Sequence, residues 1–100
     1  MRKHAKTLLV INAEGVLEKP LVRDVRERGA QGWTVTEVHG GSLEGVREGA
    51  WEADRTIELK VICEAAVADT IAEHVLATYA QHYSVVLWFA DVQVLRPQRY

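Results

Sequence analysis

The clearest hydrophobic pattern in the chain is an alternation with a period of two over residues 56–63. Ile57, Leu59, Val61 and Cys63 alternate with threonine, glutamate and lysine. A period of two is typical of a strand with one buried face. The pattern therefore predicts a strand here. Cys63, the only cysteine, is expected to be a small core side chain rather than part of a disulfide or metal clip.

Three further segments have the composition of strands. Residues 7–13 are β-branched and aliphatic, residues 33–39 are rich in threonine and valine, and residues 83–95 are mostly apolar. The last of these is apolar on both faces over residues 85–90. Because an exposed apolar patch is a liability, we expect another copy of the protein to cover the second face.

Two segments between these strands show helical spacing of their apolar residues. The first has Pro20 in its first turn and Gly29 as its C-terminal stop. Its apolar side carries Leu17, Leu21, Val22 and Val25, and its charged side carries Lys19, Arg23, Asp24, Arg26 and Glu27. In the second helix, apolar residues recur every four positions, at Val67, Ile71, Val75 and Tyr79. The order β-α-β-β-α-β predicts an α+β, ferredoxin-like fold: one domain over residues 1–100, with two helices on one face of a four-stranded antiparallel sheet.

The connection Gly40–Arg55 is much longer than the roughly 2–5 residues that a hairpin needs, which indicates a functional loop. At its start, Gly40, Gly41 and Ser42 can present backbone N–H groups to an anion. Arg47 can grip a phosphate or carbonate with two hydrogen bonds. Arg96 and Arg99 follow the last strand, where a closed oligomer could bring them near a neighbour's loop.

Composition and residue spacing exclude several classes of protein. With 48% hydrophobic and 26% charged residues and a net charge of −2, the chain is neither disordered nor a basic nucleic-acid binder. No apolar run approaches the ~18 residues that span a bilayer, so we expect a cytoplasmic protein without membrane insertion. The four histidines lack metal-ligand spacing, so no metal is expected. No catalytic arrangement stands out, which predicts a protein that is not an enzyme.

Residues 29–40 closely resemble the Gly-x-x-Gly-x-Thr-Val-Thr-Glu-Val-x-Gly segment of the PII signalling proteins. The similarity extends along the chain to an Asp-Val-Gln-Val-Leu-Arg ending at residues 91–96. The resemblance implies a homotrimer that binds adenine nucleotides in the clefts between subunits. It also implies that residues 40–55 are a T-loop, which changes conformation with the ligand and docks on a transporter, enzyme or regulator.

Two departures from the usual PII pattern indicate which branch of the family this chain resembles. The loop is short and has no tyrosine, and residues 80–84 replace the glycine-rich phosphate loop, which implies a weaker grip on a terminal phosphate. The trimmed pattern is similar to the SbtB-like branch that is linked to bicarbonate transporters and carboxysome gene clusters. That likeness implies ADP or AMP as ligand, bicarbonate as a second one, and a transporter or carbon-fixation component as partner.

The resemblance also implies a set of nucleotide-binding residues. Gly32 and Thr34 match positions in the adenine–ribose pocket, although strand propensity alone would explain the threonines. Lys60 replaces a glutamate of the family, and Arg96 matches an arginine from the adjacent subunit. The full set is Gly32, Thr34, Thr36, Gly40, Gly41, Ser42, Arg47, Lys60, Arg96 and Arg99.

Three other classes of protein share this order of strands. An RNA-recognition module needs stacking aromatic residues on the strand at residues 56–63, and a heavy-metal domain needs two cysteines where the chain has Asn12 and Glu14. A small dimeric ferredoxin-like enzyme of the oxygenase or isomerase type stays open as an alternative, and its mass in solution would distinguish it from a trimer.

Overall fold

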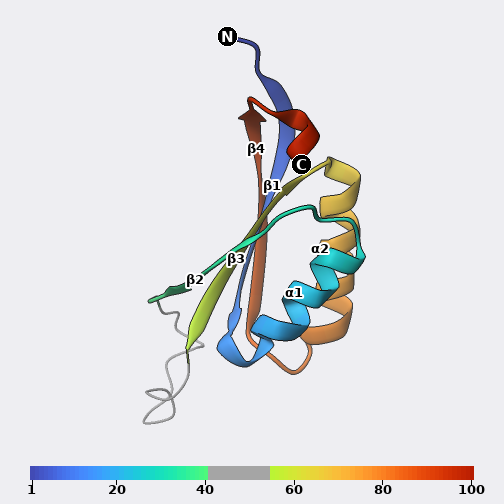
Figure 1. The fold of residues 1–100 in the computed structure, drawn as a ribbon. Helices are drawn as coiled ribbons and strands as arrows, with labels where there is room; N and C mark the ends of the chain where they lie inside the picture. Colours follow the sequence, from blue (N-terminus) through green and yellow to red (C-terminus); the bar gives the residue numbers. More distant parts are fainter. Residues whose placement is uncertain (41–54) are drawn as a thin grey trace.

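The computed structural model describes residues 1–40 and 55–100 (Figure 1). The loop predictions for Gly41, Ser42 and Arg47 lie outside these residues. The elements are β1 (His4–Glu14), η1 (Gly15–Leu17), α1 (Glu18–Glu27), β2 (Thr34–Val38), β3 (Thr56–Cys63), α2 (Ala65–Tyr79), β4 (Val85–Val94) and η2 (Pro97–Arg99). The predicted β-α-β-β-α-β order is confirmed.

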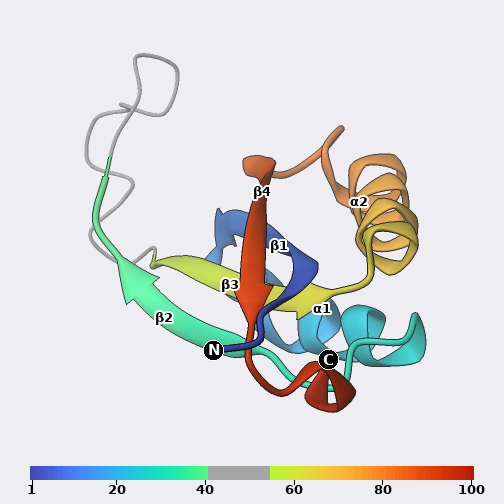
Figure 2. The same ribbon diagram turned by 90° about the horizontal axis from the view of Figure 1, so that it is seen from above.

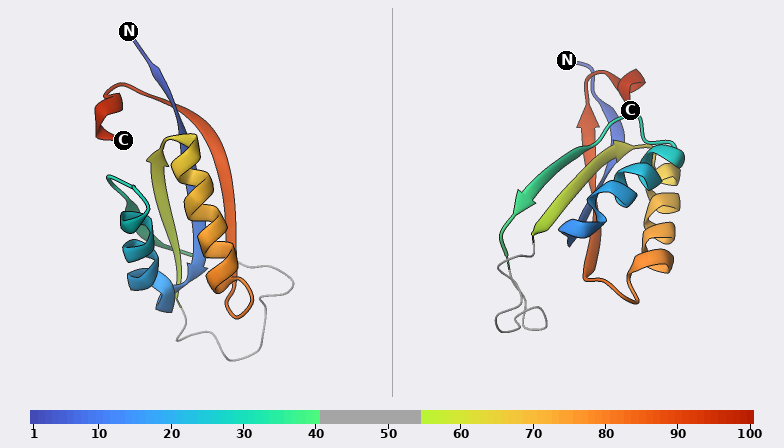
Figure 3. Two further views of the ribbon diagram at one scale, coloured as in Figure 1. Left: turned by 90° about the vertical axis from the view of Figure 1, so that its right-hand side faces the viewer. Right: turned by 60° about the horizontal axis from the view of Figure 1, so that its bottom comes forward.

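The four strands form one antiparallel sheet in the order β2-β3-β1-β4. Both helices lie on the same face of this sheet, as Figures 1 and 3 show. The fold is therefore ferredoxin-like, as predicted from the sequence. We call the sheet face that points away from the helices the open face.

The core lies between the helices and the sheet. Leu9 and Ile11 of β1 and Leu59 of β3 are fully buried there. Cys63 is 2% exposed and forms no disulfide, so its predicted place in the core is confirmed. Burial raises the pKa of the Cys63 thiol above its usual value, which keeps the thiol protonated and inert.

The first helix begins one turn later than its apolar spacing suggests. Gly15–Leu17 form a 3-10 turn, and α1 itself begins at Glu18. Its predicted end is confirmed, because α1 stops at Glu27 and Gly29 follows with a φ of 111°. That left-handed conformation favours glycine, and it lets the Ala30 N–H donate back to the Val25 carbonyl across 3.0 Å.

The position of Asp24 differs from the one that the helical pattern predicts. Its spacing put it on the charged side of α1, yet its side chain is buried and the whole residue is 3% exposed. The reason is α2, which packs beside α1 and supplies Tyr79 and His74 as polar partners. A buried carboxylate of this kind is stable because its partners replace the water that it loses.

The strands also differ in length from the patterns that predict them. Strand β1 runs from His4 to Glu14, beyond the expected residues 7–13, because it pairs with β4 from His4 to Ala13. Strand β4 starts at Val85 because the turn after α2 occupies the preceding residues. Long pairing between β1 and β4 extends that side of the sheet.

Candidate functional site

Thr34, Thr36 and Lys60 share the open face of the sheet. Thr34 lies directly opposite Lys60, and Thr36 lies opposite Glu58. Lys60 Nζ lies 3.4 Å from Glu58 Oε1, so the lysine charge is partly balanced within its own strand. The structure thus brings three of the predicted ligand residues into one polar area, formed by β2 and β3.

Arg96, Arg99 and Gly32 lie at one end of the sheet. Arg96 follows β4, and the Arg99 N–H donates to the Arg96 carbonyl across 3.0 Å in η2. The segment that enters β2 passes this same end, as Figures 1 and 2 show. Gly32 and both arginines are exposed.

Gly40 lies at the other end, beyond the C-terminal residue of β2. A strand rises about 3.3 Å per residue, so the chain from Thr34 to Gly40 covers about 20 Å. Within one protomer, the described site residues are therefore spread from one end of the sheet, across its open face, to the other end. The structure does not bring them together into a single pocket.

The other half of the open face, formed by β1 and β4, is apolar. Val10 lies opposite both Lys60 and Trp88, and Val86 lies opposite Asn12. Trp88 is 44% exposed and Val86 is 56% exposed, whereas Val10 is buried beneath its neighbours. The apolar surface predicted on the last strand therefore exists, and it adjoins the polar area of β2 and β3.

Arg55 is a contact residue that sequence reasoning missed. Its Nη1 donates to Glu37 Oε2 across 3.3 Å, and its Nη2 lies 3.6 Å from Glu18 Oε1. Its carbonyl accepts a hydrogen bond of 2.7 Å from the Gly15 N–H. Arg55 thereby fastens the start of β3 to α1 and β2. The only sequence signal was a cation at the end of a long loop.

The turn between α2 and β4 lies where the resemblance expects a phosphate loop. Several of its N–H groups already have acceptors: the His82 and Tyr83 N–H groups donate to the Tyr79 carbonyl, across 3.1 and 2.9 Å. The Ser84 N–H donates to Glu14 Oε2 across 2.7 Å. A carboxylate thus occupies a backbone N–H that an anion could otherwise use.

Within residues 1–40 and 55–100, no three histidine, cysteine, aspartate or glutamate side chains come together as metal ligands. None of the helices in this part of the chain is long and apolar enough to cross a membrane.

The fold and these residues define a ferredoxin-like protein whose sheet has helices on one face and an open second face (Figure 1). Residues 6–99 match the family model of the nitrogen regulatory protein P-II, so this chain belongs to the P-II family. The resemblance seen in the sequence is confirmed. A search of curated proteins found no match.

Solved structures extend the comparison. The chain is 35% identical to a protein of Thermus thermophilus that is named for its likeness to PII signalling proteins, with a TM-score of 0.84 over 100% of this chain and 99% of that one. It also resembles CPII of Thiomonas intermedia K12, solved with ADP, AMP and acetate (19% identity, TM-score 0.84, 100% and 98% coverage). A second CPII structure holds ADP and bicarbonate (21% identity, TM-score 0.83, 98% and 96% coverage). At these identities the CPII structures support the fold.

Proposed function

We propose that this protein is a non-catalytic cytoplasmic sensor that binds an adenine nucleotide in the clefts between the subunits of a homotrimer. The proposal rests on where the exposed ligand residues of the described chain lie: Gly32, Arg96 and Arg99 are at one end of the sheet, Gly40 is at the other, and the rest are on the open face between them. About 20 Å of extended chain separates Thr34 from Gly40. A nucleotide between two copies would reach both ends, with one copy contributing Thr34 and Arg96 and the other Gly40 and Arg47.

The apolar half of the open face supports the assembly. Trp88 and Val86 expose about half of their apolar area next to the polar ligand residues, and burying the remaining half contributes about 1 kcal/mol each. A second copy placed on this face would cover both residues and would also bring its own sheet end close to Lys60. Assembly and completion of the ligand site are then one event.

The ligand class is an adenine nucleotide with few phosphates. CPII was solved with ADP, AMP and bicarbonate, which supports ADP or AMP here and bicarbonate as an additional anion. The occupied N–H groups of residues 82–84 leave little backbone to hold a third phosphate. Lys60, Arg96 and Arg99 supply the positive charge that phosphates need.

Residues 40–55 are the signalling element of the proposal. As a T-loop with Arg47 near its centre, the segment would change its population of conformations when nucleotide binds. A transporter or a carbon-fixation component that recognises one of those conformations would then respond to the state of inorganic-carbon metabolism.

Two measurements test the proposal together. We expect a trimer by mass in solution, and calorimetric binding of ADP or AMP with one site per chain and with or without bicarbonate. A folded trimer that binds no nucleotide would overturn the proposal. A dimer with a closed apolar pocket would favour the oxygenase or isomerase alternative.

Two variants sharpen this test. Arg96→Ala should weaken binding about 10–100-fold because it removes a charge-assisted contact to phosphate, whereas Arg2→Ala, at an exposed arginine before β1, should leave the affinity unchanged. Trp88→Glu should convert the trimer to smaller species, since it places a charge on the apolar half of the open face.

A further inference from the structure

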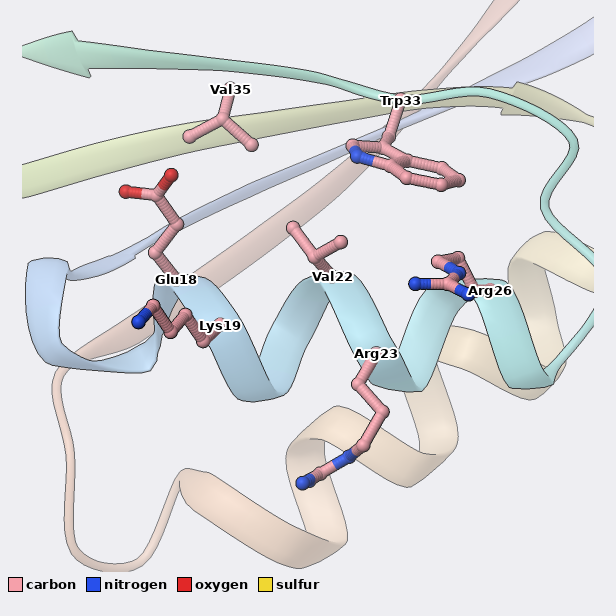
Figure 4. Close-up of a pocket in the computed structure, with 7 residues that line it drawn as sticks. All are labelled: Glu18, Lys19, Val22, Arg23, Arg26, Trp33 and Val35. Atoms are coloured by element: carbon pink, nitrogen blue, oxygen red, sulfur yellow. The ribbon is translucent and has the colours of Figure 1, made fainter.

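A groove runs between α1 and the edge strand β2, on the side of the sheet that the helices cover (Figure 4). It has a volume of about 490 Å³, and its apolar floor consists of Val22, Val35 and the side chain of Trp33 (Figure 4). Trp33 is 38% exposed. Trp33 and Val35 alternate with Thr34 and Thr36, so they lie on the opposite side of the chain from the predicted nucleotide residues.

The rim of the groove is positively charged, although the whole chain carries a net charge of −2. Arg26 places its guanidinium 5.9 Å from the centre of the Trp33 ring, and Lys19 lies about two turns earlier on the same helix. Neither cation has a carboxylate partner among residues 1–40 and 55–100. Both charges are therefore available to an acidic ligand.

The remaining charges of the groove have partners already. Arg23 Nη2 lies 3.3 Å from Asp24 Oδ1 and points away from Trp33 in Figure 4. Glu18, the one carboxylate of the lining, lies 3.6 Å from Arg55 Nη2. The groove thus keeps a net positive rim after its internal pairs are counted.

The groove follows the outer side of β2, which is the edge of the sheet. In the described chain, β2 pairs only with β3, so the backbone groups on its other side have no strand partner there. An unpaired strand edge is a template for an added strand. An apolar floor beside that edge offers room for every second side chain of such a strand.

We propose that this groove binds an extended acidic peptide segment of a partner protein by adding it as a strand to β2. Backbone hydrogen bonds to Thr34–Val38 hold the peptide, and its apolar side chains contact Val22, Val35 and Trp33. Its carboxylates pair with Lys19 and Arg26. Charge complementarity favours an acidic occupant over a second copy of this chain. Within the described residues, the groove has two cations without a carboxylate partner, and its one carboxylate already pairs with Arg55.

The test uses the protein and a short extended peptide, blocked at both ends. Of its side chains that face α1, the central one is valine and the two outer ones are glutamate, so that one face carries both the apolar group and the carboxylates. We expect calorimetric binding that weakens as salt is added, together with NMR shifts at the backbone amides of Thr34–Val38. The same peptide with lysine in place of glutamate should not bind. Absence of binding by the glutamate peptide, or shifts confined to other elements, would overturn the proposal.

A matched pair of double variants tests whether the charges of Lys19 and Arg26 bind the peptide. Lys19→Gln with Arg26→Gln should weaken binding about three- to tenfold, as expected for two solvent-exposed ion pairs. Arg2→Gln with Lys3→Gln changes the net charge equally at the exposed N-terminus and should have no effect. Equal losses of affinity in both double variants would show that the net charge of the protein attracts the peptide and that the groove does not bind it, which would overturn the proposal.

Hydrogen exchange in the peptide-free protein tests whether a second copy of the chain, and not a peptide, covers the edge of β2. If the edge of β2 is open, the outward amides of Thr34–Val38 exchange fast without peptide and slow down when it is added. Slow exchange of all these amides in the peptide-free assembly would mean that a second copy already covers the edge, and this result would overturn the proposal.

Discussion

The Tyr79 hydroxyl donates a hydrogen bond to Asp24 Oδ2 and so joins the last turn of α2 to the middle of α1. His74 Nε2 lies 3.2 Å from the same carboxylate oxygen, and Arg28 Nη2 lies 2.9 Å from His74 Nδ1. Because an arginine can only donate, His74 Nδ1 accepts, and the neutral imidazole then carries its proton on Nε2. Nε2 is buried and, in the described chain, lies near the Asp24 carboxylate without a hydrogen bond of good geometry. These four side chains hold the two helices in register above the sheet.

Tyr79→Phe should change how the stability of the protein depends on pH. Burial, together with the Asp24 carboxylate, raises the pKa of Tyr79 from 10.0 to about 12. Between these values the folded protein keeps a proton that the unfolded chain releases, so stability is constant below pH 10 and falls as pH rises toward 12. The slope is at most about 1.4 kcal/mol per pH unit.

Urea denaturation of both proteins at pH values from about 8 to about 11 measures this effect. These values lie on both sides of ~10, the pKa of a tyrosine in the unfolded chain. The phenylalanine variant should lose about 1–3 kcal/mol at pH 8, because the buried Asp24 loses one donor. Its loss relative to the wild type should shrink above pH 10. An identical alkaline decline in both proteins would contradict the assignment.

Gly15→Ala should destabilise the fold by about 1–3 kcal/mol. A β-carbon at Gly15 would lie 2.9 Å from Arg55 Cβ and 3.2 Å from the Arg55 carbonyl oxygen, so the contact that fastens β3 to α1 would have to shift. Gly32→Ala is the matched control, because nothing lies within 4 Å of its added β-carbon. Chemical denaturation compares the two variants, and an equal loss in both would rule out the steric reason.

Mixing two weakened variants should restore nucleotide binding. Under the proposal, Arg96 and Arg47 reach one nucleotide from two different chains, so a cleft between an Arg96→Ala chain and an Arg47→Ala chain can contain both intact residues. We expect calorimetry on co-refolded mixtures to recover a fraction of the wild-type sites. Mixtures that bind no better than their components would mean that each site belongs to a single chain.

Glu14→Gln should increase the affinity for ADP more than the affinity for AMP. The Glu14 carboxylate accepts the Ser84 N–H across 2.7 Å, so its negative charge lies where an added phosphate would need a donor. Removing the charge lowers the repulsion that the longer phosphate chain meets. Titration of both nucleotides against both proteins measures the ratio, and an unchanged ratio would place Glu14 away from the phosphates.

Hydrophobic periodicity predicted the elements of this fold because it reports burial directly. Ile57, Leu59 and Val61 alternate in the sequence and all face the core, and Gly29 ends α1 where a left-handed residue is needed. The boundaries were less accurate because the pairing partner decides where a strand stops. Strand β1 reaches His4 only because β4 continues to Val94.

The contacts around the site could not be predicted in the same way. The ion pairs of Arg55 join residues far apart in the sequence, and no local pattern encodes which carboxylates a cation will meet. Asp24 appeared to be one more charge on a polar helix face until α2 was placed beside it. The roles of Gly32, Thr34 and Thr36 came from family resemblance and stay predictions.

The division of the ligand residues between two ends of one sheet has a consequence for the amount of protein present. If each nucleotide binds between two copies, an isolated chain has no complete site, and binding is linked to association by mass action. Nucleotide would then promote assembly, and dilution would release nucleotide. Such a sensor responds to its own concentration as well as to that of its ligand.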